Sequence, residues 1–212
     1  MTTASWYDDN ADTFVNNTLH LPTHPILKTW LTTTPKDSIL DLGCGAGRDT
    51  KAMVDAGWDV TAIDPSGAMI AKVHDLVGHP KNLVTKQSDA QSFLTQNKRF
   101  DRIWAMASLL HMPNSELPLT LDLSAQALNP DGQFFTCFKA PAKGDIDEVR
   151  EKCGRTFTHL SLSGLKNTLN ATTSFKRKNA TCHVFEETAT ASHGETVSWT
   201  CLLFHKHGNP LT

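Results

Sequence analysis

An α/β fold, with a doubly wound, mostly parallel sheet and helices on both of its faces, is predicted by two features of the sequence. From about residue 38, short apolar runs alternate with longer segments of helical periodicity, which is the order that βαβ units produce. In addition, an apolar strand leads directly into closely spaced glycines, as the first strand of such sheets does. The chain has 212 residues, of which 39% are hydrophobic, and we expect a single domain over residues 1–212.

The middle of the chain, residues 38–139, is expected to supply the parallel strands and their crossover helices. Connecting helices are predicted by helical periodicity, and Gly57 and Gly78 follow two of them as stop signals. The run Asn129-Pro130-Asp131-Gly132 is typical of a turn. The predicted strands are 38–42, 59–63, 83–86, 100–105 and 133–138, and the predicted helices are 48–56, 65–77 and 116–128.

The two ends of the chain carry weaker signals. Residues 1–35 are expected to form a helical lid, with one helix over 25–31. Residues 140–212 are expected to complete the sheet, beginning with a loop and a helix. The loop is predicted over 140–145, the helix over 160–169, and two strands over 174–186 and 195–205 with Gly194 between them. Because a glycine-containing turn separates these strands, we expect an antiparallel hairpin at the sheet edge.

Charge and targeting signals argue against some classes of protein. The net charge of −2 does not favour a nucleic-acid partner, and the run Lys176-Arg177-Lys178 is typical of a solvated turn. The first ten residues lack the basic start and apolar core of a signal peptide, and no apolar run is long enough to cross a bilayer. We therefore expect a cytoplasmic protein without a membrane partner.

Cysteine and histidine spacing predicts no metal site. The five cysteines show no C-x-x-C spacing, which argues against a disulfide framework or a cysteine-rich zinc site. The histidines show no H-x-x-x-H or H-E-x-x-H spacing. His205 and His207 share one strand face, which we interpret as a coincidence of an edge strand.

The strongest signal of ligand binding is the run Asp41-Leu42-Gly43-Cys44-Gly45-Ala46-Gly47-Arg48. Closely spaced glycines let the backbone approach a ligand where a Cβ would collide, although a tight turn without a ligand is the alternative. The phosphate loop G-x-x-x-x-G-K-[ST] is absent, and Arg48 stands where the dinucleotide fingerprint needs a glycine. A carboxylate at Asp41 would attract an ammonium group and repel a pyrophosphate, so a ligand with an amino-acid end is favoured.

Two further acids follow the next two predicted strands. Asp64 is placed to accept hydrogen bonds from ribose hydroxyls, and Asp89 from an adenine amino group. Each is also placed to cap a following helix, which is the structural alternative. Three acids at three successive strand ends meet at one edge of a parallel sheet, and together they predict a nucleoside-binding crevice.

These residues resemble a known family. The stretch from Asp41 to Asp64, with Ser88-Asp89-Ala90 and 100–105, is similar to class I S-adenosylmethionine-dependent methyltransferases. More narrowly, residues 42–49 and 107–113 resemble small stand-alone bacterial enzymes of the small-molecule branch, distant relatives of which are the tellurite-resistance and thiopurine methyltransferases. The resemblance is good over 38–139; one departure is Asn129-Pro130-Asp131-Gly132, where the family usually has Lys-Pro-Gly-Gly.

The resemblance implies a Rossmann-like, seven-stranded sheet and a site for S-adenosyl-L-methionine. Asp41 would lie near the cofactor's ammonium, Arg48 near its carboxylate, and Asp64 at the ribose hydroxyls. Tyr7, with Trp6, would belong to the lid. The remaining expected cofactor-binding residues are Gly43, Cys44, Gly45, Gly47 and Ala105 along the methionine part, and Pro65, Met69, Asp89 and Ala90 around the adenine.

The sequence gives weaker signals for the residues that would bind the methyl acceptor. His111 follows the fourth predicted strand and suits a general base near neutral pH, with a structural histidine as the alternative. Lys139 and Arg155 are candidates for binding an anionic acceptor, with exposed surface charges as the alternative.

The sequence thus predicts methyl transfer by in-line displacement to a small molecule, with S-adenosyl-L-homocysteine as product, by a monomer or homodimer. A nicotinamide-dependent oxidoreductase is disfavoured, because Arg48 stands where the dinucleotide fingerprint needs a glycine. An RNA or protein methyltransferase, and a non-catalytic protein that binds the cofactor for regulation, stay open as alternatives.

Overall fold

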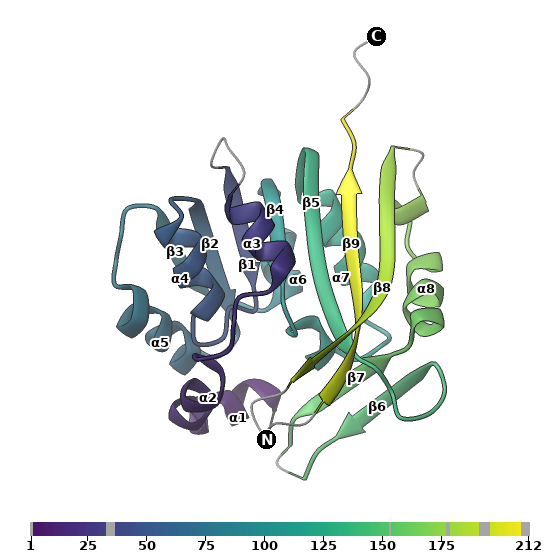
Figure 1. The fold of residues 1–212 in the computed structure, drawn as a ribbon, viewed down its shortest axis with the longest axis horizontal. Helices are drawn as coiled ribbons and strands as arrows, with labels where there is room; N and C mark the ends of the chain where they lie inside the picture. The colour runs from purple at the N-terminus through teal and green to yellow at the C-terminus, as the bar shows by residue number, and fades with distance from the viewer. Residues whose placement is uncertain (1, 33–36, 153, 177–178, 191–195, 209–212) are drawn as a thin grey trace.

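A computed structural model describes residues 2–32, 37–152, 154–176, 179–190 and 196–208. Within these residues a seven-stranded sheet has the order β3-β2-β1-β4-β5-β9-β8 (Figure 1). The first five strands in this order are parallel, and β9 is antiparallel to both β5 and β8. The predicted fold class is confirmed. The strands are β1 Ser38–Leu42, β2 Asp59–Asp64, β3 Leu83–Gln87, β4 Phe100–Ala105, β5 Leu128–Lys139, β8 Ala180–Thr190 and β9 Thr196–Lys206.

Helices cover both faces of this sheet. Leu27 and Trp30 of α3 and Met53 of α4 join the core on one face, whereas residues of α6, α7 and α8 join the core on the other. No helix among the described residues has the length and apolar character needed to cross a bilayer. The helices are α1 Thr3–Asp9, α2 Ala11–Thr18, α3 Pro25–Leu31, α4 Arg48–Asp55, α5 Gly67–Val77, α6 Ala90–Leu94, α7 Leu117–Gln126 and α8 Leu162–Asn170, with 3₁₀ turns η1 Leu109–His111 and η2 Ser174–Lys176.

The N-terminal segment contains more helix than the sequence predicts. Besides α3, the helices α1 and α2 lie at the edge of the sheet where the parallel strands end (Figure 1). The start of α1 is stabilised by a capping box, in which Thr2 and Ser5 exchange hydrogen bonds between side chain and backbone. Both helices are short, and only Ala11 is buried among their residues, so helical periodicity gives a weak signal there.

The C-terminal part departs from the prediction at three places. A two-stranded sheet of β6 Ile146–Arg150 and β7 Thr156–Leu160 stands where no strand is predicted. The predicted turn at 129–132 lies inside β5, in an irregular stretch where Asp131 has a φ of 62°. Strand β8 begins at Ala180, because residues 174–176 form η2. The hairpin of β8 and β9 is confirmed, while Gly194, Arg177 and Lys178 lie outside the described residues.

Candidate functional site

The glycine turn between β1 and α4 has the backbone that only glycine adopts freely. Gly43, Gly45 and Gly47 have φ values of 82°, 51° and 87°. The N–H groups of Gly43 and Cys44 both donate to the carbonyl of Ile63, at 2.9 Å each, which ties the turn to β2. The turn is therefore held with its backbone at the carboxyl ends of β1 and β2, where ligands of doubly wound sheets bind.

Asp41 lies buried at the end of β1. Its Oδ2 accepts a hydrogen bond from Thr50 Oγ1 at 2.6 Å, and burial together with the nearby Asp49 raises the pKa of this carboxyl to about 7. Arg48 does not neutralise Asp41 directly. Its Nε and Nη2 donate to the two oxygens of Asp49, at 2.8 and 2.9 Å, and Trp104 Nε1 donates to Asp49 Oδ2 at 2.8 Å. Arg48, which is expected to bind the cofactor's carboxylate, thus already forms two hydrogen bonds with Asp49.

Asp64 lies at the end of β2, beside the glycine turn. Its carboxylate accepts the N–H groups of Gly45 and Ser66, at 3.0 and 2.9 Å. Burial outweighs these bonds and raises the pKa of Asp64 to about 6. Because a carboxylate has about four acceptor positions, two remain available to hydroxyl groups of a ligand.

The residues expected around the adenine lie in the segments that follow β2 and β3. Asp89 caps α6, since its Oδ1 accepts the N–H of Ser92 at 2.9 Å, and this bond lowers the pKa of Asp89. Met69 is fully buried and Pro65 is exposed, while Ala90 follows Asp89 at the start of α6. Ala105 is buried at the end of β4.

Helices α1 and α2 cover the glycine turn. A Cβ built on Gly45 would lie 3.2 Å from the ring of Phe14 in α2, and Tyr7 contacts the Phe14 ring edge-to-face at 5.1 Å. Asp8 of α1 holds the start of α5, because its Oδ1 accepts from Ser66 Oγ at 2.6 Å and from the N–H of Ala68 at 3.1 Å. The N-terminal segment therefore contacts both the glycine turn and the start of α5, and its role as a lid stays a prediction.

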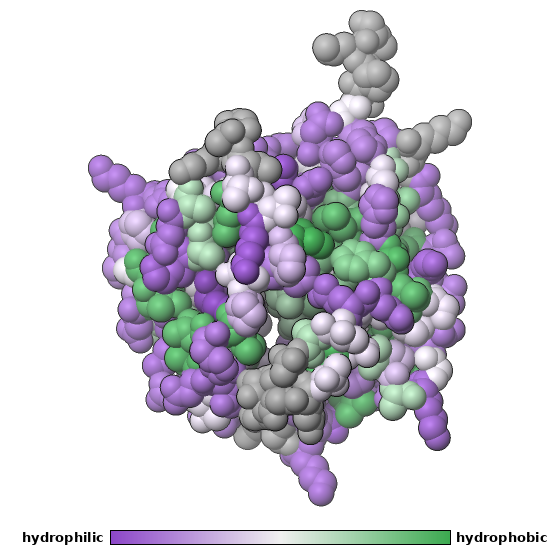
Figure 2. Space-filling view, in the orientation of Figure 1, coloured by the Kyte–Doolittle hydropathy of each residue, from purple (hydrophilic) through white to green (hydrophobic). Residues whose placement is uncertain are grey.

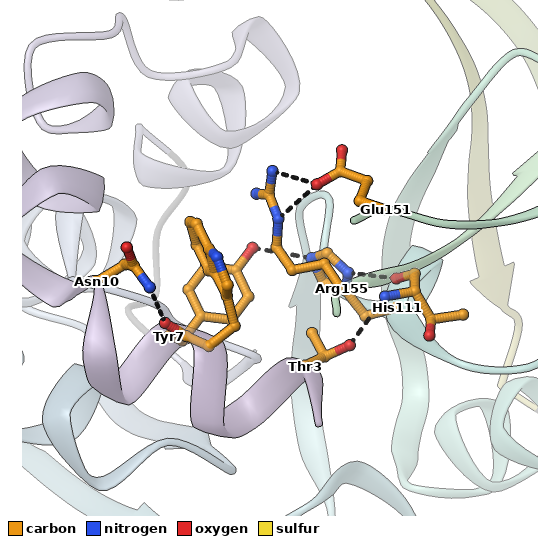
Figure 3. Close-up of polar contacts among 8 residues, drawn as sticks. Thr3, Tyr7, Asn10, His111, Glu151 and Arg155 are labelled. Carbon is orange, nitrogen blue, oxygen red and sulfur yellow. Dashed lines mark hydrogen bonds and ion pairs between the residues drawn. The ribbon is translucent and has the colours of Figure 1, made fainter. Parts of the chain in front are cut away.

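Tyr7 also reaches the acceptor side, where it contacts His111 (Figure 3). The hydroxyl of Tyr7 is 2.9 Å from His111 Nε2, and His111 Nδ1 is 2.9 Å from the carbonyl of Thr156. Because a carbonyl only accepts, Nδ1 carries the proton and Nε2 accepts from Tyr7. Burial lowers the pKa of His111 to about 4, below the near-neutral value expected from the sequence, and raises the pKa of Tyr7 to about 12.

The two cationic candidates lie beside this pair, around Phe157 of β7. Lys139 Nζ is 4.9 Å from the centre of the Phe157 ring, and the Arg155 guanidinium is 5.1 Å from it and 4.1 Å from that of Trp6. Arg155 also donates to Glu151 Oε2 from Nε and Nη2, at 2.9 and 2.7 Å (Figure 3). His111, Lys139 and Arg155 are thus brought together by the short sheet of β6 and β7. Phe157 and Glu151 were not expected at the site, because the sequence does not predict the strands β6 and β7 around them.

Comparisons with known proteins show what the middle of the chain is similar to. Residues 39–132 match the family described as a methyltransferase domain. The ubiquinone biosynthesis O-methyltransferase of Xanthomonas campestris pv. campestris is 34% identical over 113 residues, which are 51% of this chain and 46% of that relative. The one of Hydrogenovibrio crunogenus is 31% identical over 46% of this chain and 41% of the relative. The chain thus spans less than half the length of these curated relatives.

Solved structures share the fold at lower sequence identity. The 1,6-didemethyltoxoflavin-N1-methyltransferase of Burkholderia thailandensis, bound to 1,6-didemethyltoxoflavin and S-adenosylhomocysteine, has a TM-score of 0.71 and 20% identity over 96% of this chain and 84% of that one. TehB from Haemophilus influenzae has a TM-score of 0.67 and 15% identity over 93% of this chain and 67% of that one. The predicted resemblance to class I S-adenosylmethionine-dependent methyltransferases is confirmed, and it is carried by residues 39–132, which match a methyltransferase domain.

Proposed function

We propose that the protein transfers a methyl group from S-adenosyl-L-methionine to a small-molecule acceptor, and releases S-adenosyl-L-homocysteine. The observation that carries the proposal is a pair of buried carboxyls, Asp41 and Asp64, beside a glycine turn in a methyltransferase domain. Neither forms an ion pair among the described residues, and burial raises the pKa of both. A ligand that brings an ammonium group and two hydroxyls would offset the cost of keeping these carboxylates buried.

The residues of the crevice fit this cofactor. Asp41 would face its ammonium and Asp64 the ribose hydroxyls, while Arg48 keeps a hydrogen-bond donor position beside the methionine end. The glycine turn with Cys44, and Ala105, would line the methionine part. Pro65, Met69, Asp89 and Ala90 would surround the adenine. When bound, the cofactor supplies an electrophilic methyl group on a positively charged sulfonium.

The protein's own contribution is mainly alignment and exclusion of water. Holding two reactants in line, roughly 3 Å apart, can contribute about 7–11 kcal/mol at best. Tyr7 and Phe14 of the lid cover the reacting edge. His111 Nε2 takes the acceptor's proton by way of the Tyr7 hydroxyl, which donates to it.

An anionic acceptor would suit the site best. Lys139 and Arg155 both lie beside Phe157, so one anionic group could form charge-assisted hydrogen bonds with both cations. Such an anion beside His111 would also favour the protonated imidazole, and would raise the pKa of His111 from its low value. An anionic acceptor would thus make His111 a stronger base.

The proposal is tested by calorimetry with S-adenosylhomocysteine, followed by a labelled-methyl screen against thiols, phenols, carboxylates, oxyanions, peptides and RNA. We expect saturable binding of the product and label transfer to a small anionic acceptor. Absence of binding at saturating ligand would overturn the assignment. Label on RNA or on peptides alone would favour the macromolecular alternative, and binding without transfer to any acceptor would favour a regulatory protein.

The surroundings of the protein are part of the same proposal. We place it in the cytoplasm, as a monomer or homodimer in one domain over residues 1–212, with a small molecule and not a nucleic acid as its partner. The near-neutral net charge of −2 argues against a nucleic-acid partner, because such proteins usually carry a strong basic excess.

Replacement of His111 by Ala is expected to lower turnover about 10²-fold with an unchanged affinity for S-adenosylhomocysteine, because a positioned base contributes this much to proton transfer. Steady-state kinetics measures the turnover, and calorimetry measures the affinity for S-adenosylhomocysteine. His159→Ala is the matched control, since the rings of His111 and His159 both lie near the Phe157 ring, with centres 4.6 and 6.1 Å from its centre. Equal turnover in the His111 and His159 variants would remove His111 from the mechanism.

A further inference from the structure

A cluster of metal-binding side chains lies at the edge of the sheet opposite the glycine turn. One nitrogen each of His205 and His207 and one carboxylate oxygen of Asp131 lie within 4.8 Å of one another. Asp131 is near the start of β5, whose other end, Lys139, reaches the acceptor side; eight strand residues separate them by about 25 Å. The cluster is therefore outside the proposed active site, at the edge where β9 ends (Figure 1).

The backbone brings these three residues together in a way that their spacing does not indicate. His205 pairs with Gln133 across the β5–β9 ladder, so that His207 continues toward Asp131. The two imidazole rings lie on one side of the strand, with their centres 4.3 Å apart. Asp131 has a left-handed backbone, with a φ of 62°, and its Oδ1 accepts the N–H of Gly208 at 2.8 Å. The sequence predicts an edge strand here, but β9 lies between β5 and β8, and a carboxylate 74 residues before His205 joins the two histidines.

The distances suit a small divalent ion. Three atoms within 4.8 Å of one another can all lie within about 2.8 Å of a common centre. Zn–N and Zn–O bonds measure about 2.0–2.2 Å, so modest side-chain rotations complete the coordination, and water takes the fourth position. Two imidazoles and one carboxylate are ligands that Zn²⁺ prefers, whereas Mg²⁺ and Ca²⁺ prefer oxygen ligands alone.

The second nitrogens of the two rings are also held, as is usual for metal-bound histidines. His207 Nε2 is 2.5 Å from Thr181 Oγ1 of β8, which leaves Nδ1 of His207 for the ion. His205 forms a hydrogen bond to the backbone of Asp131. Arg102 is a cation near His205. Its guanidinium donates to the carbonyl of Asp101 at 2.8 Å and lies over the Trp30 ring. The negative charge of Asp131 counteracts the repulsion between Arg102 and a bound cation.

We propose that Asp131, His205 and His207 bind one Zn²⁺ ion, which joins the end of β9 to the start of β5. The ion lies away from the reacting edge and has a structural role. Coordination uses the neutral imidazoles and the carboxylate, and needs no co-reactant. The site is independent of the proposed methyl transfer, so either proposal can fail without the other.

The experiment is a competition titration of the untagged chain with Zn²⁺ against a chromophoric chelator, with Mg²⁺ and Ca²⁺ as further probes. We expect one equivalent of Zn²⁺ and neither of the other ions. Asp131→Asn, which keeps a side chain that tolerates a positive φ, and His205→Gln and His207→Gln should each weaken binding at least tenfold. Thr181→Val should weaken it about tenfold through the ring of His207.

The matched control is His79→Gln. His79 stacks on His74 with ring centres also 4.3 Å apart, but this pair is not part of a three-ligand cluster among the described residues. Its zinc affinity should equal that of the wild type. Absence of stoichiometric Zn²⁺ in the wild-type chain would overturn the proposal, and so would equal affinities in the wild type and the three ligand variants.

Discussion

Replacement of Asp64 by Asn is expected to weaken the binding of S-adenosylhomocysteine about 10²-fold or more. A hydrogen bond to a charged group contributes about 1.5–3 kcal/mol, and loss of two ribose contacts therefore removes at least about 3 kcal/mol. The carboxylate of Asp64 already accepts the N–H groups of Gly45 and Ser66. An asparagine has one acceptor oxygen, and its NH₂ group would face either these backbone donors or the ribose hydroxyls. Calorimetric titration of the variant and the wild type measures the difference.

The control for this substitution is Asp55→Asn. Asp55 is exposed on α4, where it pairs with Lys51 at 2.7 Å, and it lies outside the crevice. Its dissociation constant should match the wild type. Circular dichroism and thermal unfolding of the Asp64 variant show whether the glycine turn still folds. A folded Asp64→Asn protein with wild-type affinity would show that this carboxylate does not bind the ligand.

The parallel core could be predicted from the sequence because its strands are buried and its turns carry glycine. In β1 and β4 the consecutive residues 39–42 and 103–105 are buried, as in strands covered on both faces, and Gly57 and Gly78 mark helix ends. Strand β6, Ile146–Arg150, was missed because three of its five residues are charged and, within the part of the chain that the structure describes, it pairs only with β7. A short, mostly polar edge strand gives little periodic signal.

The site shows the same division between local and tertiary information. The positions of Asp41 and Asp64 follow from strand ends, which a sequence pattern can locate. The pairing of Arg48 with Asp49 and Trp104 depends on side-chain directions, and the contact between Tyr7 and His111 joins residues 104 positions apart. Such contacts arise from tertiary packing, which no local pattern in one sequence contains.

Asp41 is expected to destabilise the unliganded protein above neutral pH, so that Asp41→Asn should raise its free energy of unfolding there. Burial moves the pKa of Asp41 from 3.8 in a model compound to about 7 in the folded protein. The folded state then binds more protons than the unfolded state between these two values, and stability falls as the pH rises through this window. The shift corresponds to at most roughly 4 kcal/mol, fully present above pH 7 and absent below about pH 4.

An asparagine at position 41 can still accept the hydrogen bond from Thr50, but its buried NH₂ group costs about 1–3 kcal/mol without a partner. We therefore expect a net gain of about 1–3 kcal/mol at pH 8 that shrinks toward pH 5, measured by urea unfolding at both pH values. S-adenosylhomocysteine should stabilise the wild type more than the variant, because its ammonium would neutralise the carboxylate that the variant lacks. An Asp41→Asn protein that is less stable at pH 8 than the wild type, or a difference that does not change with pH, would mean that this carboxyl is already satisfied in the empty protein. Binding of the cofactor would then not stabilise the protein by neutralising a buried charge at Asp41.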